Sequence, residues 1–240
     1  MIDLTECLIS FALALCLSLI TYRFGLLTRS GCASAFLIGF GIGALGSVWW
    51  LALLIVFALA GFAATLTGLS KKREKGLQEG THGERSYKNI LGVALPPMAI
   101  AVLNQIFEEY FWEFSVAYIA TIAVAAADTV GSELGVKDPR VWLITTFRRV
   151  EPGTDGGISP NGTLLSFAAS VFVSVIGYLF IMHTLDVWVI VPAVCGMIGC
   201  LADSYVGATI ETWGYVSKYT NNCMTGLLGG ILAAVACVLL

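Results

Sequence analysis

Long, uninterrupted runs of apolar residues dominate this sequence and restrict the folds open to it. Of the 240 residues, 58% are hydrophobic and only 12% are charged, about half the charged fraction of an ordinary soluble domain. The apolar residues do not alternate with polar ones at the period of a strand or of a surface helix. Runs of about 20 such residues are typical of helices that cross a bilayer. The sequence therefore predicts an all-α, polytopic membrane helical bundle, with residues 1–240 forming a single integral membrane domain.

The apolar runs predict about eight transmembrane helices. Their expected bounds are 4–22, 31–46, 48–69, 89–106, 114–134, 162–182, 187–212 and 222–240. The first run follows Asp3 and Glu6 rather than the basic region of a secretory signal, so we expect it to be retained as a span. Only Gly46 and Ser47 separate the second and third runs, which leaves a short, tilted or re-entrant helix as an alternative for either.

The basic residues favour eight helices over seven. All thirteen lysines and arginines fall in the loops that follow the first, third, fifth and seventh runs. The other loops contain Glu108, Glu109, Glu113 and Asp186 and no basic residue. Because Lys and Arg are enriched in cytoplasmic loops, eight spans put every basic residue inside and both termini on the outer side. Merging the second and third runs breaks this segregation.

Four carboxylates interrupt the apolar runs: Asp128 and Glu133 in the fifth, and Asp203 and Glu211 in the seventh. A carboxylate inside the membrane is costly unless it is paired, hydrated or bound to a metal, so it indicates a functional site. Both spans are expected to run from outside to inside, which puts all four acids in the cytoplasmic half. The alternative is a buried aspartate that hydrogen-bonds a hydroxyl and locks two helices together.

Two aspartates on neighbouring helices suit Mg²⁺, which binds one or two carboxylates and completes its shell with water and substrate phosphates. We expect Asp128, Glu133 and Asp203 to be the metal ligands. Glu133 follows Asp128 by five residues, which separates them by about 140° around a regular helix. They converge only if the helix opens near Gly131; otherwise they have different partners.

The loop before the sixth run carries features that suit phosphate binding. Arg148 and Arg149 offer forked hydrogen-bond donors. The glycine-rich segment 153–157 can place successive N–H groups around an anion, and it leads into the N-terminus of a helix, which also favours anions. A plain glycine-rich turn is the alternative. Three polar residues before the last run either complete this site or cap a helix: Lys218, Asn221 and Asn222.

Three motifs, in the order ADTVGSELG, LITTFRRVEPGTDGGIS followed by GT, and ADSYVGATIE, resemble the integral membrane family that includes the plant phytyl-phosphate kinases. The resemblance covers nearly the whole chain. It implies a prenyl monophosphate as the acceptor and a nucleoside triphosphate, with CTP favoured, as the donor. The product is then a diphosphate, such as the phytyl diphosphate used in tocopherol biosynthesis.

The residue patterns and this resemblance together define the expected site. Catalytic roles are expected for Asp128, Glu133, Asp203 and Arg148. Residues expected to bind substrate or phosphate are Arg85, Asn89, Ser132, Thr146, Arg149, Gly153, Thr154, Gly156, Gly157, Ser159, Ser204, Lys218, Asn221 and Asn222.

The leading hypothesis is a Mg²⁺-dependent kinase for an isoprenoid monophosphate of phytyl or geranylgeranyl type, with its site at the cytoplasmic membrane face. One alternative is a CTP-dependent lipid-phosphate nucleotidyltransferase, which releases pyrophosphate. The other is a secondary transporter that uses Asp128 and Asp203 as ion sites. The expected partners are the prenyl phosphate, the nucleotide and membrane lipids. A homodimer is a further candidate assembly. The net charge of −3 argues against nucleic acid.

Overall fold

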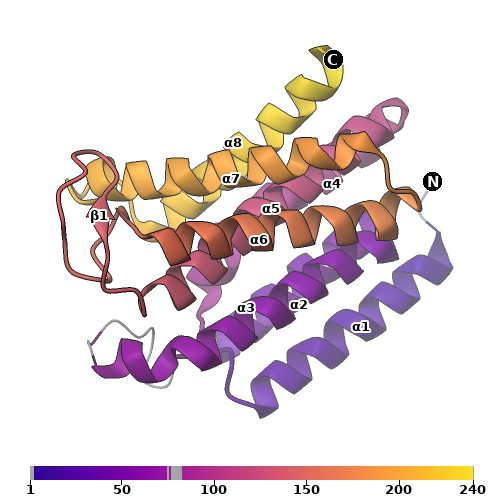
Figure 1. Ribbon diagram of the computed structural model, residues 1–240. Helices are drawn as coiled ribbons and strands as arrows, with labels where there is room; N and C mark the ends of the chain where they lie inside the picture. The colour runs from indigo at the N-terminus through magenta and orange to yellow at the C-terminus, as the bar shows by residue number, and fades with distance from the viewer. Residues whose placement is uncertain (1–2, 75, 77–82, 240) are drawn as a thin grey trace.

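The computed structural model describes residues 3–74, 76 and 83–239, and within them the chain forms a bundle of eight long helices (Figure 1). These are α1 (Leu4–Arg23), α2 (Arg29–Leu45), α3 (Val48–Glu74), α4 (Tyr87–Ile106), α5 (Phe111–Gly135), α6 (Pro160–Gly177), α7 (Ile190–Val206) and α8 (Lys218–Leu239). Short helical turns flank them: η1 (Glu108–Tyr110), η2 (Tyr178–Met182), η3 (Val187–Val189) and η4 (Gly207–Glu211). Each apolar run corresponds to one long helix, which confirms the predicted helical membrane fold.

Helix α2 is the shortest of the eight helical segments once flanking turns are counted, because α7, also of 17 residues, is continued by η3 and η4 from Val187 to Glu211. Seven helical segments of the described chain are long and apolar enough to cross a membrane, whereas α2 has 17 residues and falls below that length. At 1.5 Å per residue it spans about 26 Å, slightly less than the hydrocarbon core of a typical bilayer. This is the short second span that the sequence left as an alternative. Gly46 and Ser47 then turn the chain directly into α3.

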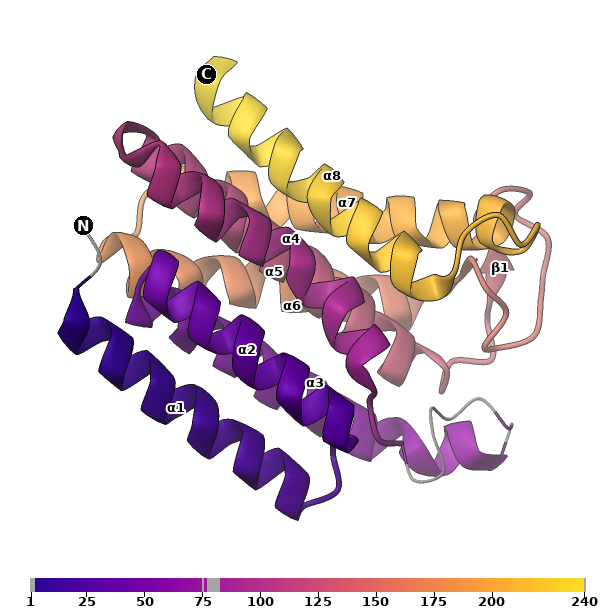
Figure 2. The same cartoon turned by 180° about the vertical axis from the view of Figure 1, so that it is seen from behind.

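Helix α5 forms the centre of the bundle. Every residue from Ser115 to Ala127 is buried, and α3, α4, α6, α7 and α8 all pack against the helix (Figures 1 and 2). Alanine and other small residues dominate this stretch. Small side chains let helix backbones approach closely in a membrane, where packing replaces the hydrophobic effect as the source of association. The buried position of α5 holds the C-terminal part of the helix, which carries Asp128, among five other helices.

Both termini lie at one end of the bundle, and the loop that carries the two short strands lies at the other (Figures 1 and 2). We call the second end the loop end. The loops that join α1 to α2, α3 to α4, α5 to α6 and α7 to α8 lie there, so the basic residues of these loops are at the loop end, as the sequence predicts. Lys75 lies outside the described residues. That the loop end is cytoplasmic remains a prediction.

The long loop between α5 and α6 folds back on itself. Strand β1 (Trp142–Leu143) pairs antiparallel with β2 (Gly157–Ile158), with Trp142 opposite Ile158. The segment between them begins with a tight turn, in which the Phe147 N–H donates to the Leu143 carbonyl over 2.8 Å. Phe147 has a φ of 52° and is 72% exposed. This ribbon brings the glycine-rich half of the loop back to the helix ends.

Candidate functional site

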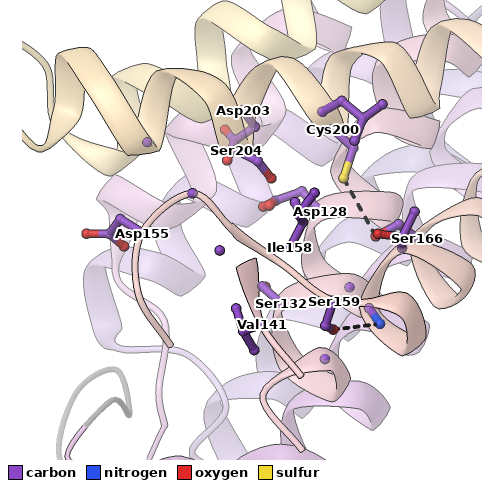
Figure 3. Close-up of a pocket in the computed structure, with 18 of the residues that line it drawn as sticks. Asp128, Ser132, Val141, Asp155, Ile158, Ser159, Ser166, Cys200, Asp203 and Ser204 are labelled. Atoms are coloured by element: carbon purple, nitrogen blue, oxygen red, sulfur yellow. Dashed lines mark hydrogen bonds between the residues drawn. The ribbon is translucent and has the colours of Figure 1, made fainter. Parts of the chain in front are cut away.

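A cavity of about 270 Å³ opens at the loop end between α5, α6 and α7, and the loop around residues 153–159 covers it. Figure 3 shows the side chains of Asp128, Asp203 and Ser204 directed into the same part of this space. Toward the membrane centre, the Cys200 thiol contacts the Ser166 hydroxyl at 3.7 Å. The two aspartates that interrupt the apolar runs therefore meet in one cavity, as the sequence predicts.

Helix α8 holds Asp203 in position from behind. The Thr225 hydroxyl donates to the Asp203 carboxylate over 3.2 Å. The side-chain amide of Asn221, which is fully buried, donates to the Asp203 backbone carbonyl over 3.1 Å and to the Glu211 carboxylate over 3.1 Å. Asn221 does not line the cavity. It connects the start of α8 to both acidic residues at the end of α7, which is a positioning role and not the phosphate contact expected from the sequence.

The end of α7 is a π-helical turn, η4, and this turn brings a third carboxylate to the cavity. On a regular α-helix Asp203 and Glu211 differ by about 80° in direction. A π-turn advances the chain less per residue, and the Thr212 hydroxyl donates to the Gly207 carbonyl over 2.6 Å across it. Both acids line the cavity as a result. Such π-turns are rare and occur frequently at functional sites.

The glycine-rich segment lies directly on η4. Gly156 has a φ of +74°, and a Cβ atom there would collide with the Ala208 side chain and the Ser204 carbonyl. Only glycine therefore permits this backbone to close the cavity. The predicted ring of N–H groups around an anion is only partly available. The Thr154 N–H donates to the Glu151 carbonyl, and the Gly157 N–H donates to the Thr154 carbonyl.

The N-terminus of α6 is capped by the protein itself. The Ser159 hydroxyl accepts a hydrogen bond from the Gly162 N–H over 3.1 Å, and the Asp138 carboxylate accepts one from the Asn161 N–H over 3.3 Å. Asp138 is buried and is also contacted by the Arg140 guanidinium at 3.1 Å. An internal carboxylate thus takes the place at this helix terminus that the sequence analysis assigned to a phosphate.

We expect acid to loosen this cap. Hydrogen bonds from the Arg140 guanidinium, the Arg140 backbone and the Asn161 N–H hold the pKa of Asp138 below its usual range. A carboxyl group with a lowered pKa in the folded state stabilises the fold fully above its unfolded pKa, and this stabilisation is lost as the pH falls through the folded value. Thermal unfolding in detergent, measured from pH 6 down to pH 3, is expected to show less acid destabilisation in Asp138→Asn than in the wild type. Equal pH dependence in both proteins would contradict this.

Glu133 lies away from the two aspartates. Helix α5 continues without a break to Gly135, so Glu133 points to another side, where its carboxylate is 3.7 Å from the Arg85 guanidinium. Arg85 also donates to the Thr65 hydroxyl over 3.0 Å and lies over the Phe62 ring at 5.9 Å. Neither Glu133 nor Arg85 lines the cavity. The pair instead fastens α5 to α3 and to the loop before α4.

Glu133→Gln tests whether this pair is structural. The side chains of Arg85 and Glu133 are 17% and 10% exposed, and removing one charge of a mostly buried pair costs about 3 kcal/mol of folding free energy, at the low end of the usual range. We therefore expect a clearly lower unfolding temperature in detergent. If Glu133→Gln has unchanged stability and its rate of phosphoryl transfer no longer depends on the Mg²⁺ concentration, the ligand role predicted from the sequence would be supported instead.

The remaining predicted residues divide into two groups. Those that line the cavity are Asp128, Ser132, Gly153, Thr154, Gly156, Gly157, Ser159, Asp203, Ser204 and Lys218. Those outside it are Arg85, Asn89, Glu133, Thr146, Arg148, Arg149, Asn221 and Asn222. Arg148 and Arg149 are exposed on the far part of the loop. The Asn89 carboxamide oxygen accepts from the Ser86 N–H over 2.9 Å as part of a capping box that starts α4. Asn222 lines a separate cavity of about 10 Å³ behind Asp128 and Asp203.

Comparison with known proteins identifies the family. The sequence profile of the family described as "Integral membrane protein DUF92" matches residues 12–235. The chain belongs to the DUF92 family of integral membrane proteins. An uncharacterised membrane protein of Methanocaldococcus jannaschii is 37% identical over 185 residues, which cover 76% of this chain and 74% of the relative. An uncharacterised membrane protein of Synechocystis is 31% identical over 87% of this chain and 81% of its own length.

A plant relative is also similar to this DUF92 chain. Protein VTE6, chloroplastic, of Arabidopsis thaliana is 29% identical over 220 residues, which cover 89% of this chain and 65% of the plant protein. No solved structure matches the chain. The family expected from the three sequence motifs is therefore confirmed. In the DUF92 fold described above, parts of all three motifs surround the same cavity.

The cavity of this DUF92 protein is acidic. Four carboxylates line it: Asp128, Asp155, Asp203 and Glu211. Within the described part of the chain, Lys218 is the one basic residue among the lining residues. Across the same residues, no cluster of three or more Asp, Glu, His or Cys side chains is arranged to hold a metal ion by itself. Mg²⁺ is commonly bound by one or two carboxylates, with water and substrate phosphates as its other ligands.

Several residues that line the cavity of this DUF92 protein were not predicted from the sequence. They are Asp155, Thr163, Ser166 and Cys200. One signal was available for α6. Its serines recur four residues apart at Ser166, Ser170 and Ser174, and all three are buried. A polar stripe at helical spacing inside an apolar span predicts a face turned toward protein and away from lipid.

Proposed function

We propose that this DUF92 protein is a kinase for an isoprenoid monophosphate. It transfers a phosphoryl group from a nucleoside triphosphate, with CTP favoured, to a phytyl- or geranylgeranyl-type phosphate. The observation that carries the proposal is an acidic cavity at the loop end, where aspartates from two neighbouring helices line the same space. The motif resemblance to the plant phytyl-phosphate kinases and the similarity to a chloroplast protein support the same reaction class.

The residues present fit a magnesium ion that is shared with substrate phosphates. Asp128 and Asp203 would hold it, because they are carboxylates from different helices that line one cavity. When bound, Mg²⁺ neutralises charge on the phosphate oxygens. An anionic nucleotide would otherwise be repelled by the carboxylates of this cavity, so the charge balance itself calls for a cation. Because substrate phosphates and water would supply the other oxygen ligands, the protein need not supply a closed set.

The protein's own residues then position the two substrates. Lys218 neutralises part of the phosphate charge from the start of α8, and Asn221 holds Asp203 and Glu211 in place. The acceptor is already an anion, so the reaction needs positioning and charge neutralisation and no strong general base. We propose that Arg148 and Arg149, on the exposed part of the same loop, meet the incoming nucleotide. Glu133, on α5, has a structural role through its ion pair with Arg85.

A transfer assay tests the proposal. Purified protein in lipid nanodiscs is incubated with CTP or ATP carrying a labelled γ-phosphate, Mg²⁺, and geranylgeranyl or phytyl monophosphate. We expect labelled prenyl diphosphate and unlabelled nucleoside diphosphate. Release of pyrophosphate with a nucleotide-linked lipid would support the nucleotidyltransferase alternative. If neither product forms with any of these acceptors, the kinase proposal is wrong.

A further inference from the structure

The wall of the cavity reaches the lipid-facing surface of the bundle between α6 and α7. Leu201 lines the cavity and is also 36% exposed. On α6, Thr163 lines the cavity and is exposed as well. Exposed lining residues on these two helices mark the place where a side opening into the bilayer would lie, in addition to the region under the glycine-rich loop.

This side opening is closed toward the membrane centre. The Ser170 hydroxyl of α6 donates to the Ala193 carbonyl of α7 over 2.7 Å, and Ser166 contacts Cys200 at 3.7 Å. These contacts join the two helices at Ser166 and Ser170, and on α6 the residues that line the cavity end at Ser166. Ser166 is six residues inside α6, so the opening reaches about 9 Å below the start of the helix at 1.5 Å per residue. This depth matches a headgroup and the beginning of a chain, and not a whole long lipid.

We propose that the acceptor, a single-chain isoprenoid phosphate, enters sideways from the bilayer through the gap flanked by Thr163 and Leu201. This inference rests on the proposed kinase function and assigns the route and the part of the substrate that is recognised. The phosphate and the first part of the chain lie inside the cavity, near Asp128 and Asp203. The rest of the chain stays in the bilayer, because the contacts at Ser166 and Ser170 leave it no path between the helices.

Side chains outside the opening suit a hydrocarbon chain. Phe167, one turn after Thr163 on α6, is 49% exposed, and Val194, on the same face of α7 as Leu201, is 46% exposed. Both are apolar, whereas the cavity itself is lined by carboxylates and Lys218. A ligand that crosses from one region to the other must be polar at one end and apolar at the other. A free nucleotide does not fit this description, and a lipid phosphate does.

One consequence is weak selection for chain length. Because the distal chain lies in lipid for every substrate, wild-type protein in nanodiscs is expected to use geranyl, farnesyl and geranylgeranyl phosphate with kcat/KM values within about fivefold of one another. A strong optimum at one length would mean that the protein encloses the chain, which would overturn the sideways route.

A substitution that narrows the opening tests the route directly. Leu201→Trp is expected to raise the KM for geranylgeranyl phosphate by about tenfold or more, with the KM for the nucleotide changed by less than about twofold. Ile231→Trp is the matched control, because Ile231 is a lipid-facing residue of α8, 59% exposed, that does not line the cavity. If Leu201→Trp and Ile231→Trp behave alike, the proposed opening is wrong.

A labelling experiment separates this inference from the kinase proposal. A prenyl phosphate with a photoreactive diazirine near its phosphate is irradiated with the protein in nanodiscs, and the labelled peptides are identified by mass spectrometry. We expect labels in 163–167 and 194–201, reduced in Leu201→Trp and competed by geranylgeranyl phosphate. Such labelling without phosphoryl transfer would disprove the kinase and retain the opening. Phosphoryl transfer with labels only on other helices would overturn the proposed opening. Competition by phosphatidate as strong as that by geranylgeranyl phosphate would show that the opening does not select a single-chain lipid, which would also overturn the proposal.

Discussion

Asp128→Asn and Asp203→Asn are each expected to lower the turnover of phosphoryl transfer by about 10²–10³-fold, the usual cost of removing one preorganised charge-stabilising group. The substitutions keep the side-chain volume and remove the negative charge. Both side chains line the same cavity, so the loss of either weakens a cation that the two would share. Turnover should be measured over a range of Mg²⁺ concentrations, because a weakened ligand set also raises the concentration of metal needed for half-maximal rate.

The double variant and a distant control sharpen this test. If Asp128 and Asp203 act on one ion, the double substitution should cost little more than the worse single substitution, because residues that act as a unit are not additive. Asp186→Asn is the matched control. Asp186 lies at the opposite end of the bundle, where its carboxylate accepts from the Trp188 N–H over 2.8 Å, and an asparagine can make the same contact. Full turnover in both single variants would show that Asp128 and Asp203 do not contribute to phosphoryl transfer.

Asn221→Asp is expected to lower turnover by about 10–100-fold, because the loss of a buried hydrogen bond to a charged group costs roughly 1.5–3 kcal/mol. The change is nearly isosteric, but it replaces the amide donor with a carboxylate beside Glu211 and the Asp203 carbonyl. These acceptors, each 3.1 Å from the amide nitrogen, then face a like charge or a lone pair. The end of α7 should shift, and with it the aspartate that lines the cavity.

The role of Asn221 is positioning, so its readout must differ from that of simple unfolding. We expect turnover of Asn221→Asp to recover partly at low pH, where a protonated carboxyl group again offers a donor, while Asn221→Ala shows no recovery. Thermal unfolding of both variants in detergent provides the reference for stability. If both variants lose activity equally at every pH and in proportion to their loss of stability, Asn221 is only part of the core.

Most of the fold could be predicted from the sequence because the bilayer leaves few choices. A spanning segment must satisfy its own backbone hydrogen bonds, so a long apolar run is a helix. When the turns η2, η3 and η4 are counted with α6 and α7, the observed helices begin and end within about four residues of the expected bounds, apart from α3, which extends past the membrane span to Glu74. The alternation of basic and acidic loops predicted eight helices, and the described residues form eight, of which α2 is too short to be counted as a full span by length.

Side-chain directions in the site were harder to predict. Asp128 and Asp203 could be expected to meet, because each lies near the loop end of a helix in the same bundle. Glu133 could not be assigned, since a five-residue spacing has two outcomes that depend on whether α5 is regular. The π-turn at η4 gives no clear signal in the sequence, and it decides where Glu211 points. Arg148 and Arg149 were expected at the cavity because they shortly precede the glycine-rich segment in the sequence. In the structure they directly follow the tight turn at Phe147, on the exposed far part of the loop.

The π-turn also limits how this region can change over evolution. A single-residue deletion between Gly207 and Glu211 would convert the turn into ordinary α-helix, and the acid, then seven residues after Asp203, would still point within about 20° of the Asp203 direction. A two-residue deletion would instead rotate the acid by about a further 100° and turn it away from the cavity, although no amino acid that touches substrate had been replaced. The number of residues in this short segment is therefore restricted as well as their identity. Insertions and deletions should be tolerated far better in the loop beyond it, around Tyr215, which is 80% exposed.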